Sequence, residues 1–235
     1  IPNNDGLVRP LHIRAPEGSI VNCTFPAPVK ARAKVIKHIP PLIFGALGGV
    51  ISERVGVVNI AIEGQLLAGA FVSAVVASVT GQPLLGLLAA MVAGVLVAFV
   101  LAAFSIKYFV DQVIVGVVLN VLITGLTSFL HGAVMQPHTA ALNSPERFPR
   151  WPIPFLSDIP IIGPVVFNQT LIVYLMYVIV PLVAWGLYRT RWGLRLRAVG
   201  EHPTAADTVG IKVNPTRFWN VLLAGGIAGI GGAYF

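Results

Sequence analysis

Charged side chains are scarce in this chain of 235 residues: 11% are charged, whereas 56% are hydrophobic. A typical soluble domain carries about 25% charged residues. Because a soluble fold of this length leaves much of its surface in water, it could not bury so much apolar surface. The composition therefore indicates an integral membrane protein. Long uncharged runs also exclude an outer-membrane β-barrel, whose strands alternate polar and apolar residues.

Cysteine and the common catalytic motifs are absent or nearly so. The single cysteine, Cys23, excludes an internal disulfide and a cysteine metal cluster. The sequence lacks the G-x-x-x-x-G-K-[ST] loop that cradles ATP, and it lacks H-E-x-x-H, C-x-x-C and G-x-S-x-G. His131 and His138 have no partner at a metal-ligand spacing. We therefore expect no catalytic residue, no metal and no cofactor.

Long apolar runs with almost no charge are what the sequence has instead. Each has about 19–23 residues, so a helix would be about 28–35 Å long and could cross a hydrocarbon core of about 30 Å. The runs are 57–79, 84–106, 112–130 and 170–188, and a further apolar helix starts near Phe218. The sequence predicts an all-α polytopic transmembrane helix bundle with about five to six spans. Because it begins with Ile1 and ends in an apolar run, we expect truncation at both ends.

The net charge of +7 is unevenly distributed. Six of the 16 Lys and Arg residues lie in 1–37 and six in 189–217. Such clusters are typical of cytoplasmic loops rather than of a groove that binds nucleic acid. The positive-inside rule places 189–217 in the cytoplasm and the Pro-rich segment 131–168 outside. The short Gly-rich segment 40–52 is either re-entrant or one half of a helix that breaks just after it.

Three polar residues interrupt the first long run: Asn59, Glu63 and Gln65. A carboxylate in a membrane helix costs about 2.5–3.5 kcal/mol, so Glu63 should face protein or water. Asn59 would lie one turn earlier on the same helical face. These residues either line a translocation path or pin the broken helix. Alternatively, Glu63 is a buried carboxylate that contributes only to packing.

Small and polar residues recur every fourth position along the run that starts at residue 112. They would form one ridge of a helix: Gln112, Gly116, Asn120, Thr124 and Ser128. The ridge either joins helices closely or lines a polar route, for which Gln112 and Asn120 are the candidates. Asp111 should cap this helix. Close helix packing is also predicted for a final glycine-rich helix with Gly225, Gly226, Gly229, Gly231 and Gly232.

The predicted cytoplasmic loop contains GLRLRAVGEHPTAADTVGI, residues 193–211. Residues 203–209 predict a short helix, which Gly200 and Gly210 would bracket as flexible joints. A short, smooth helix between joints suits a part that docks on another protein and transmits movement. The alternative is an ordinary charged loop that follows the orientation rule.

Three segments carry a resemblance to a known family: ISERVGVVNIAIEGQLLAGAF (51–71), DQVIVGVVLN (111–120) and GLRLRAVGEHPTAADTVGI (193–211). They resemble the permeases of bacterial ABC importers, above all the nucleoside and simple-sugar permeases, which are related to ribose and branched-chain amino-acid permeases. The resemblance covers residues 36–235 and implies a multi-pass protein of the bacterial inner membrane. It further implies that the cytoplasmic loop contacts an ATPase through Arg197, Gly200, Glu201, Ala205, Ala206 and Gly210.

The resemblance also implies partners and a mechanism. A separate ABC ATPase subunit would bind the loop, a second permease subunit would complete the path, and an extracytoplasmic substrate-binding protein would deliver a nucleoside or simple sugar. ATP-driven closure of the ATPases would push the loops and alternate access, so this chain would not itself be an enzyme. The alternative is a channel or an ion-coupled carrier that uses Glu63 for protons.

The first 34 residues resemble a different family. Their RP-x-x-x-x-APEGS and FPAPVKAR stretches are similar to the B subunit of hydantoinase and oxoprolinase enzymes, which leaves a hydantoin-cleaving enzyme as a further alternative. The piece is too short to fold as that enzyme. We therefore predict a polar Pro-rich segment, 1–37, outside the permease fold, followed by a transmembrane permease domain, 38–235.

Overall fold

The computed structural model describes residues 11–14, 20–23, 39–136, 150–152 and 168–234, and the chain divides into two units, Ile1–Ile39 and Pro40–Phe235. In the first unit, strand β1 (Leu11–Arg14) pairs antiparallel with β2 (Ile20–Cys23). The candidate site described below lies in the second unit.

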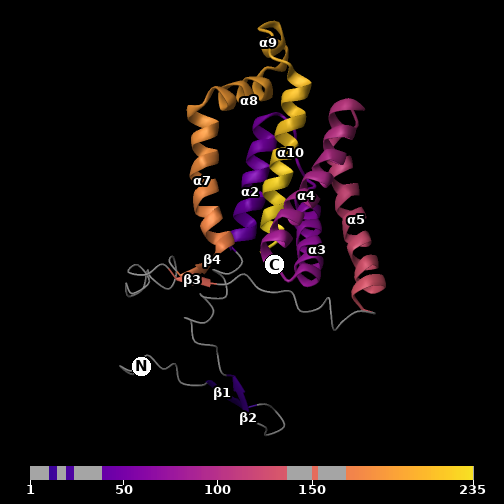
Figure 1. Cartoon of the computed structure of the whole chain (residues 1–235), viewed down its shortest axis with the longest axis vertical. Coiled ribbons are helices and arrows are strands. Elements are labelled where there is room, and N and C mark those ends of the chain that lie inside the picture. The colour runs from indigo at the N-terminus through magenta and orange to yellow at the C-terminus, as the bar shows by residue number, and fades with distance from the viewer. Residues whose placement is uncertain (1–10, 15–19, 24–38, 137–149, 153–167, 235) are drawn as a thin grey trace. The chain divides into compact units, whose positions relative to one another are not determined.

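The second unit is a bundle of helices (Figure 1). Its helices are α2 (Ile39–Arg54), α3 (Ile62–Thr80), α4 (Pro83–Ala102), α5 (Gln112–Leu130), α7 (Leu171–Arg189), α8 (Arg191–Glu201), α9 (Pro203–Thr208) and α10 (Val213–Gly232). The π-helical turns η1 (Ala103–Lys107) and η2 (His131–Met135) extend α4 and α5. The short strands β3 (Arg150–Pro152) and β4 (Asn168–Thr170) pair antiparallel, and β4 leads directly into α7.

Four helical segments of the described chain are long and apolar enough to cross a membrane: 62–80, 83–107, 112–135 and 171–189. Helix α10 is the fifth predicted span. It begins at Val213 rather than at Phe218, because Pro215 lies in the first turn, where a missing backbone N–H costs no helical hydrogen bond. The prediction of an all-α polytopic membrane bundle is confirmed.

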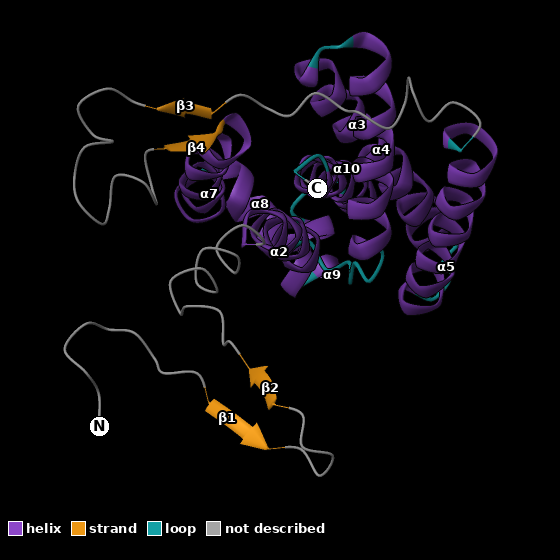
Figure 2. Ribbon diagram, turned by 90° about the horizontal axis from the view of Figure 1, so that it is seen from below, coloured by secondary structure: helices purple, strands orange, loops and turns teal. Residues whose placement is uncertain are grey.

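Helix α10 is the centre of the packing: it contacts α3 and α4 (Figure 2), and it approaches α2 closely at glycines. A Cβ atom at Gly225 would collide with Ala98 of α4, and one at Gly229 would collide with the carbonyl oxygen of Ala90. Gly69 of α3 meets Gly229 from another side, where a Cβ would lie 2.5 Å from its carbonyl oxygen. The prediction of close packing around these glycines is confirmed, because only hydrogen side chains leave room for the neighbouring backbones.

Gly229→Ala should therefore destabilise the bundle by about 1–3 kcal/mol, the usual cost of overpacking a full core. The measurement is the thermal midpoint of the detergent-purified protein. Gly125→Ala on α5 is the matched control, because its Cβ would meet nothing within 4 Å and alanine favours a helix. Equal midpoints for the two variants would contradict the packing described for α10.

The helix predicted from residue 57 begins only at Ile62, and residues 55–61 form a non-helical linker. The chain leaves α2 through Gly56, whose φ of 82° suits glycine. The linker backbone then hydrogen-bonds to side chains of α5 instead of continuing a helical ladder. The prediction that Asn59 shares a helical face with Glu63 is wrong for this reason, because Asn59 precedes the helix.

Helix α2 runs beside α10 in the opposite direction. Near its start, Phe44 lies against Gly231, and Gly48 lies against Ala224 at mid-length. Beyond its last turn, Gly56 approaches the Arg217 side chain. The short Gly-rich segment 40–52 therefore lies within one helix of 16 residues, after which the helix breaks and the chain returns through α3.

Candidate functional site

Helices α8 and α9 form an elbow between α7 and α10 at one end of the bundle (Figure 1). The hydroxyl of Thr190 starts α8 by accepting a hydrogen bond from the Gly193 backbone N–H at 3.2 Å. Leu196 and Val199 are fully buried, while Arg195 on the other side of α8 is exposed. Three arginines of the predicted loop, Arg191, Arg195 and Arg197, thus belong to an amphipathic helix that is anchored to the bundle by its apolar side.

Helix α9 confirms the predicted short helix and starts at Pro203, a favoured first residue. Its Ala205 is exposed, as are Glu201 just before it and Gly210 just after it. Ala206 instead is 4% exposed and belongs to the chain's own hydrophobic core. Within α9 itself, Ala205 therefore offers more surface to a partner than Ala206 does.

The two glycines that bracket α9 differ in their surroundings. Gly210 has a φ of 86° and no atom within 4 Å of where a Cβ would be, which is consistent with a joint. Gly200 lies inside α8, where a Cβ would collide with the carbonyl oxygen of Arg54. The prediction of a flexible joint at Gly200 is wrong, because this glycine is required for close contact with α2 rather than for movement.

Arg197 projects from α8 over the ring of Tyr188, with 5.5 Å between its guanidinium carbon and the ring centroid. The Tyr188 hydroxyl accepts a hydrogen bond from Arg54 at 3.5 Å. Tyr188 therefore lies between two cations, one from α8 and one from the end of α2. A cation over an aromatic ring contributes about 0.5–1 kcal/mol at exposed sites. This arrangement binds the elbow to the ends of α7 and α2.

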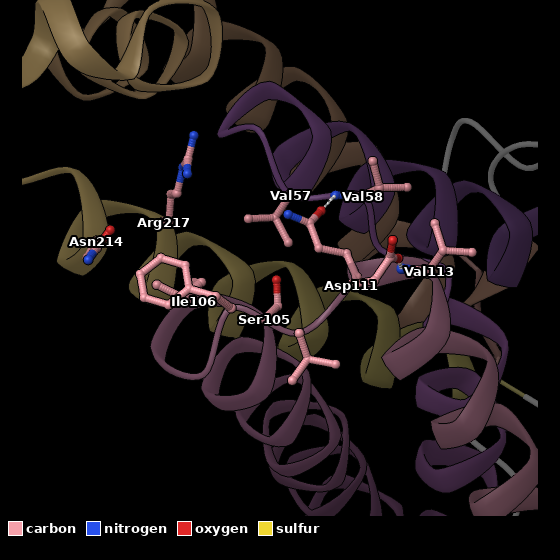
Figure 3. A pocket seen from close by; sticks show the side chains of 11 residues that line it. Val57, Val58, Ser105, Ile106, Asp111, Val113, Asn214 and Arg217 are labelled. Carbon is pink, nitrogen blue, oxygen red and sulfur yellow. Dashed lines mark hydrogen bonds between the residues drawn. The ribbon is translucent and has the colours of Figure 1, made fainter.

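Two hollows flank the start of α10. One, of about 430 Å³, is lined by Ser105, Asp111 and Gln112 together with Asn214 and Arg217 of α10. Figure 3 shows Asn214 and Arg217 on one side and Asp111 at the start of α5 on the other. The second hollow, of about 500 Å³, lies between α9 and the start of α10. Asn214 and Arg217 line both, so the start of α10 separates them.

The predicted polar ridge of α5 holds the linker. The side chain of Gln112 accepts a hydrogen bond from the Val58 N–H at 2.7 Å (Figure 3). At Gly116 a Cβ would lie 2.9 Å from the Cβ of Ile60, so glycine lets the linker approach the helix. Non-helical backbone inside a membrane must find partners within the protein, and this ridge supplies them.

Asn120 makes the central contact of this ridge. Its Nδ2 donates to the Ile60 carbonyl at 3.0 Å, and its Oδ1 accepts from the Gly64 N–H at 2.8 Å. One amide side chain thus bridges the end of the linker and the first turn of α3.

The predicted N-cap at the start of α5 is confirmed. The Asp111 side chain accepts hydrogen bonds from the backbone N–H groups of Val113 and Ile114.

The remaining candidates of the translocation path lie around the same break. Asn59 and Gln65 are both buried, and the Nδ2 of Asn59 donates to the Oε1 of Gln65 at 3.2 Å. Among the described residues, the Asn59 Oδ1 and the Gln65 Nε2 have no hydrogen-bond partner. Glu63 is exposed on the surface of α3. The five candidates therefore cluster at one break, and of these five residues Glu63 alone is exposed.

Comparison with known proteins identifies the family. The family model described as "Branched-chain amino acid transport system / permease component" matches residues 32–235. The chain belongs to this permease family. It is 41% identical over 205 residues to the guanosine ABC transporter permease protein NupQ of Bacillus subtilis, which covers 84% of this chain and 64% of the relative. It is 39% identical over 210 residues to the nucleoside ABC transporter permease protein NupC of Lactococcus lactis, which covers 86% and 66%.

Both of these permease relatives are longer than this chain. It spans about two thirds of the length of each of these two permeases. No solved structure matches it. The resemblance to ABC-importer permeases is confirmed, and with it a multi-pass membrane protein. The family match does not extend to the first 31 residues, and most of the segment that resembles hydantoinase lies outside the described residues.

Arg217 is the residue of the site that sequence reasoning missed. Its guanidinium donates to backbone carbonyls of two other segments. In the sequence, Arg217 is a single cation just before an apolar run, and the positive-inside rule alone accounts for a cation there. A cation at that position satisfies the orientation rule equally well when it is bonded inside the protein.

Proposed function

We propose that this permease is the membrane subunit of an ABC importer in the bacterial inner membrane that carries a nucleoside or simple sugar. The observation that supports this best is the α8–α9 elbow, in which α9 projects from the bundle beyond α8 (Figure 1) and both Glu201 of α8 and Ala205 of α9 are exposed. Two relatives named as guanosine and nucleoside permeases favour a nucleoside. In this proposal the α8–α9 elbow contacts an ATPase subunit that supplies ATP hydrolysis.

The proposal includes two further partners. A second permease subunit completes the translocation path, and an extracytoplasmic substrate-binding protein delivers the solute. The path passes the break between α2 and α3, where Glu63 faces it. Asn59, Gln65, Gln112 and Asn120 position the linker there. An exposed carboxylate at the start of an apolar helix supports this placement, because lipid would be an unfavourable neighbour for it.

Uptake of labelled guanosine into proteoliposomes tests the proposal. With the ATPase, the second permease and the binding protein present, uptake should require ATP and should exceed uptake of labelled glucose. Uptake that persists without the ATPase and follows a proton gradient would favour the carrier alternative instead. In a proton-coupled carrier, Glu63→Gln should abolish uptake. In the ABC importer, the same substitution should raise the KM for guanosine and leave the ATP requirement intact.

The same uptake assay tests whether the N-terminal segment takes part in transport. We propose that residues 1–37, including the stretch that resembles hydantoinase, take no part in transport. Their removal should leave guanosine uptake per assembled transporter unchanged. A loss of uptake, or ring opening of a hydantoin by the intact protein, would contradict this.

A further inference from the structure

Three segments meet where α2 ends, where α8 ends and where α10 begins. A Cβ at Gly56 would lie 3.3 Å from the Gly200 Cα, and a Cβ at Gly200 would collide with the Arg54 carbonyl oxygen. The backbones of the linker and of α8 therefore touch without intervening side chains. We call this contact of Gly56, Gly200 and Arg217 the inner junction.

Arg217 completes the junction from α10. Its Nε donates to the Val55 carbonyl at 3.2 Å, and its Nη2 donates to the Val199 carbonyl at 3.5 Å. These carbonyls belong to the C-terminal ends of α2 and α8, where the last C=O groups lack helical partners and carry partial negative charge. One planar cation thus satisfies both helix ends at once, a geometry for which a guanidinium is suited and an ammonium is not.

The junction is continuous with the break in the membrane helix. Val58, three residues after Val55, bonds to Gln112, and Ile60 bonds to Asn120. Asn120 lies eight residues into α5, about 12 Å along that helix. The linker therefore runs from the inner junction to the Asn59–Gln65 pair as non-helical chain. No helical turn lies between them that could absorb a displacement of Val55 and Gly56.

We propose that Arg217 is a positioning residue that couples movement of the α8–α9 elbow to the linker 55–61. This inference rests on the proposed function, because the elbow moves only if an ATPase acts on it. A displacement of α8 acts on Val199 and Gly200, and the junction passes it to Val55 and Gly56. The linker then changes its position along the ridge of α5, beside Glu63 and the Asn59–Gln65 pair.

Arg217→Met in the assembled transporter tests the coupling. Solute uptake and ATP hydrolysis are measured in the same proteoliposomes and expressed as solute per ATP. We expect this ratio to fall about fivefold or more, which corresponds to the usual range of coupling between sites. The amount of assembled complex is measured in parallel and is expected to fall, because two hydrogen bonds from a charged group are lost, which stabilise more than those between neutral groups. The ratio of solute to ATP does not depend on that amount. Arg217→Lys should restore the ratio only in part.

Lys107→Met is the matched control, because it removes a cation from the same end of the bundle outside the junction. Its ratio should equal that of wild type. An unchanged ratio in Arg217→Met, or an equal fall in Lys107→Met, would overturn the inference. A purely structural role would lower the amount of complex and leave the ratio of the remaining complexes unchanged.

Gly200→Ala provides a second, independent test of the junction. Its Cβ would collide with the Arg54 carbonyl oxygen and push α8 away, while the Arg217 side chain itself is unchanged, so it should lower the same ratio. If the Arg217→Met permease does not assemble into a transporter, the ratio measured for Gly200→Ala is the test. If neither variant assembles, the inference is overturned in favour of a purely structural role. If the wild-type transporter shows no ATP-driven uptake, the proposed function has failed, which is a separate result.

Discussion

Glu201→Arg should abolish co-purification of the permease with its ATPase while the permease still inserts into the membrane. Glu201 is exposed at the end of α8, directly before α9. Loss of a paired charge from a docking surface costs about 2–5 kcal/mol, and 2 kcal/mol alone weakens binding roughly 30-fold. The insertion signal should be unaffected, because the substitution adds a cation to a segment that is already positive.

The control for this prediction is Glu53→Arg. Glu53 is an exposed acid near the end of α2, so the chemical change is the same but lies outside the elbow. Co-purification should persist in this variant, and uptake by Glu201→Arg should be lost in proportion to the lost ATPase. If Glu201→Arg retains the ATPase, or if both variants lose it, the α8–α9 elbow is not the specific docking site.

Asn120→Leu should have the second large effect, on both folding and uptake. The substitution leaves the Ile60 carbonyl and the Gly64 N–H without the partners that the side chain now provides. Each unsatisfied buried group costs about 1–3 kcal/mol, so about 2–6 kcal/mol is expected for the pair. The thermal midpoint of the purified protein and the uptake rate per assembled transporter are the measurements.

Thr124→Val is the control one turn along the same ridge. The Thr124 hydroxyl bonds only to the carbonyl of Asn120 within its own helix, at 2.8 Å, and the side chain is exposed. We expect a change within about 0.5 kcal/mol and normal uptake. A similar loss in both variants would mean that α5 is generally sensitive and that the bridge to the linker has no special role.

The membrane helices could be predicted because lipid imposes their length and composition on each segment separately. The run 112–130 and its cap at Asp111 agree with α5 for this reason. The small-residue pattern of α10 likewise predicted close contacts, since that requirement is local to the helix surface. The short helix after Gly200 was predictable from Pro203, which favours a first turn.

The linker and the junction could not be predicted, because their structure depends on partners far away in the sequence. Residues 57–61 are mostly apolar, like a membrane helix, and the distant side chains of Gln112 and Asn120 help to hold them in another conformation. Gly200 was expected to be a joint because a glycine needed for flexibility and one needed for close contact look identical in sequence. The contacting backbone lies in a different helix.

The glycine contacts of α10 have a consequence for how the bundle rearranges. Where Gly229 meets Ala90 and Gly225 meets Ala98, the spacing between α4 and α10 is set by main-chain atoms and single methyl groups. No rotamer change can widen or fill that seam, unlike a seam lined by leucines. We therefore expect α4 and α10 to stay together in any rearrangement of the bundle, with the larger displacements in other helices.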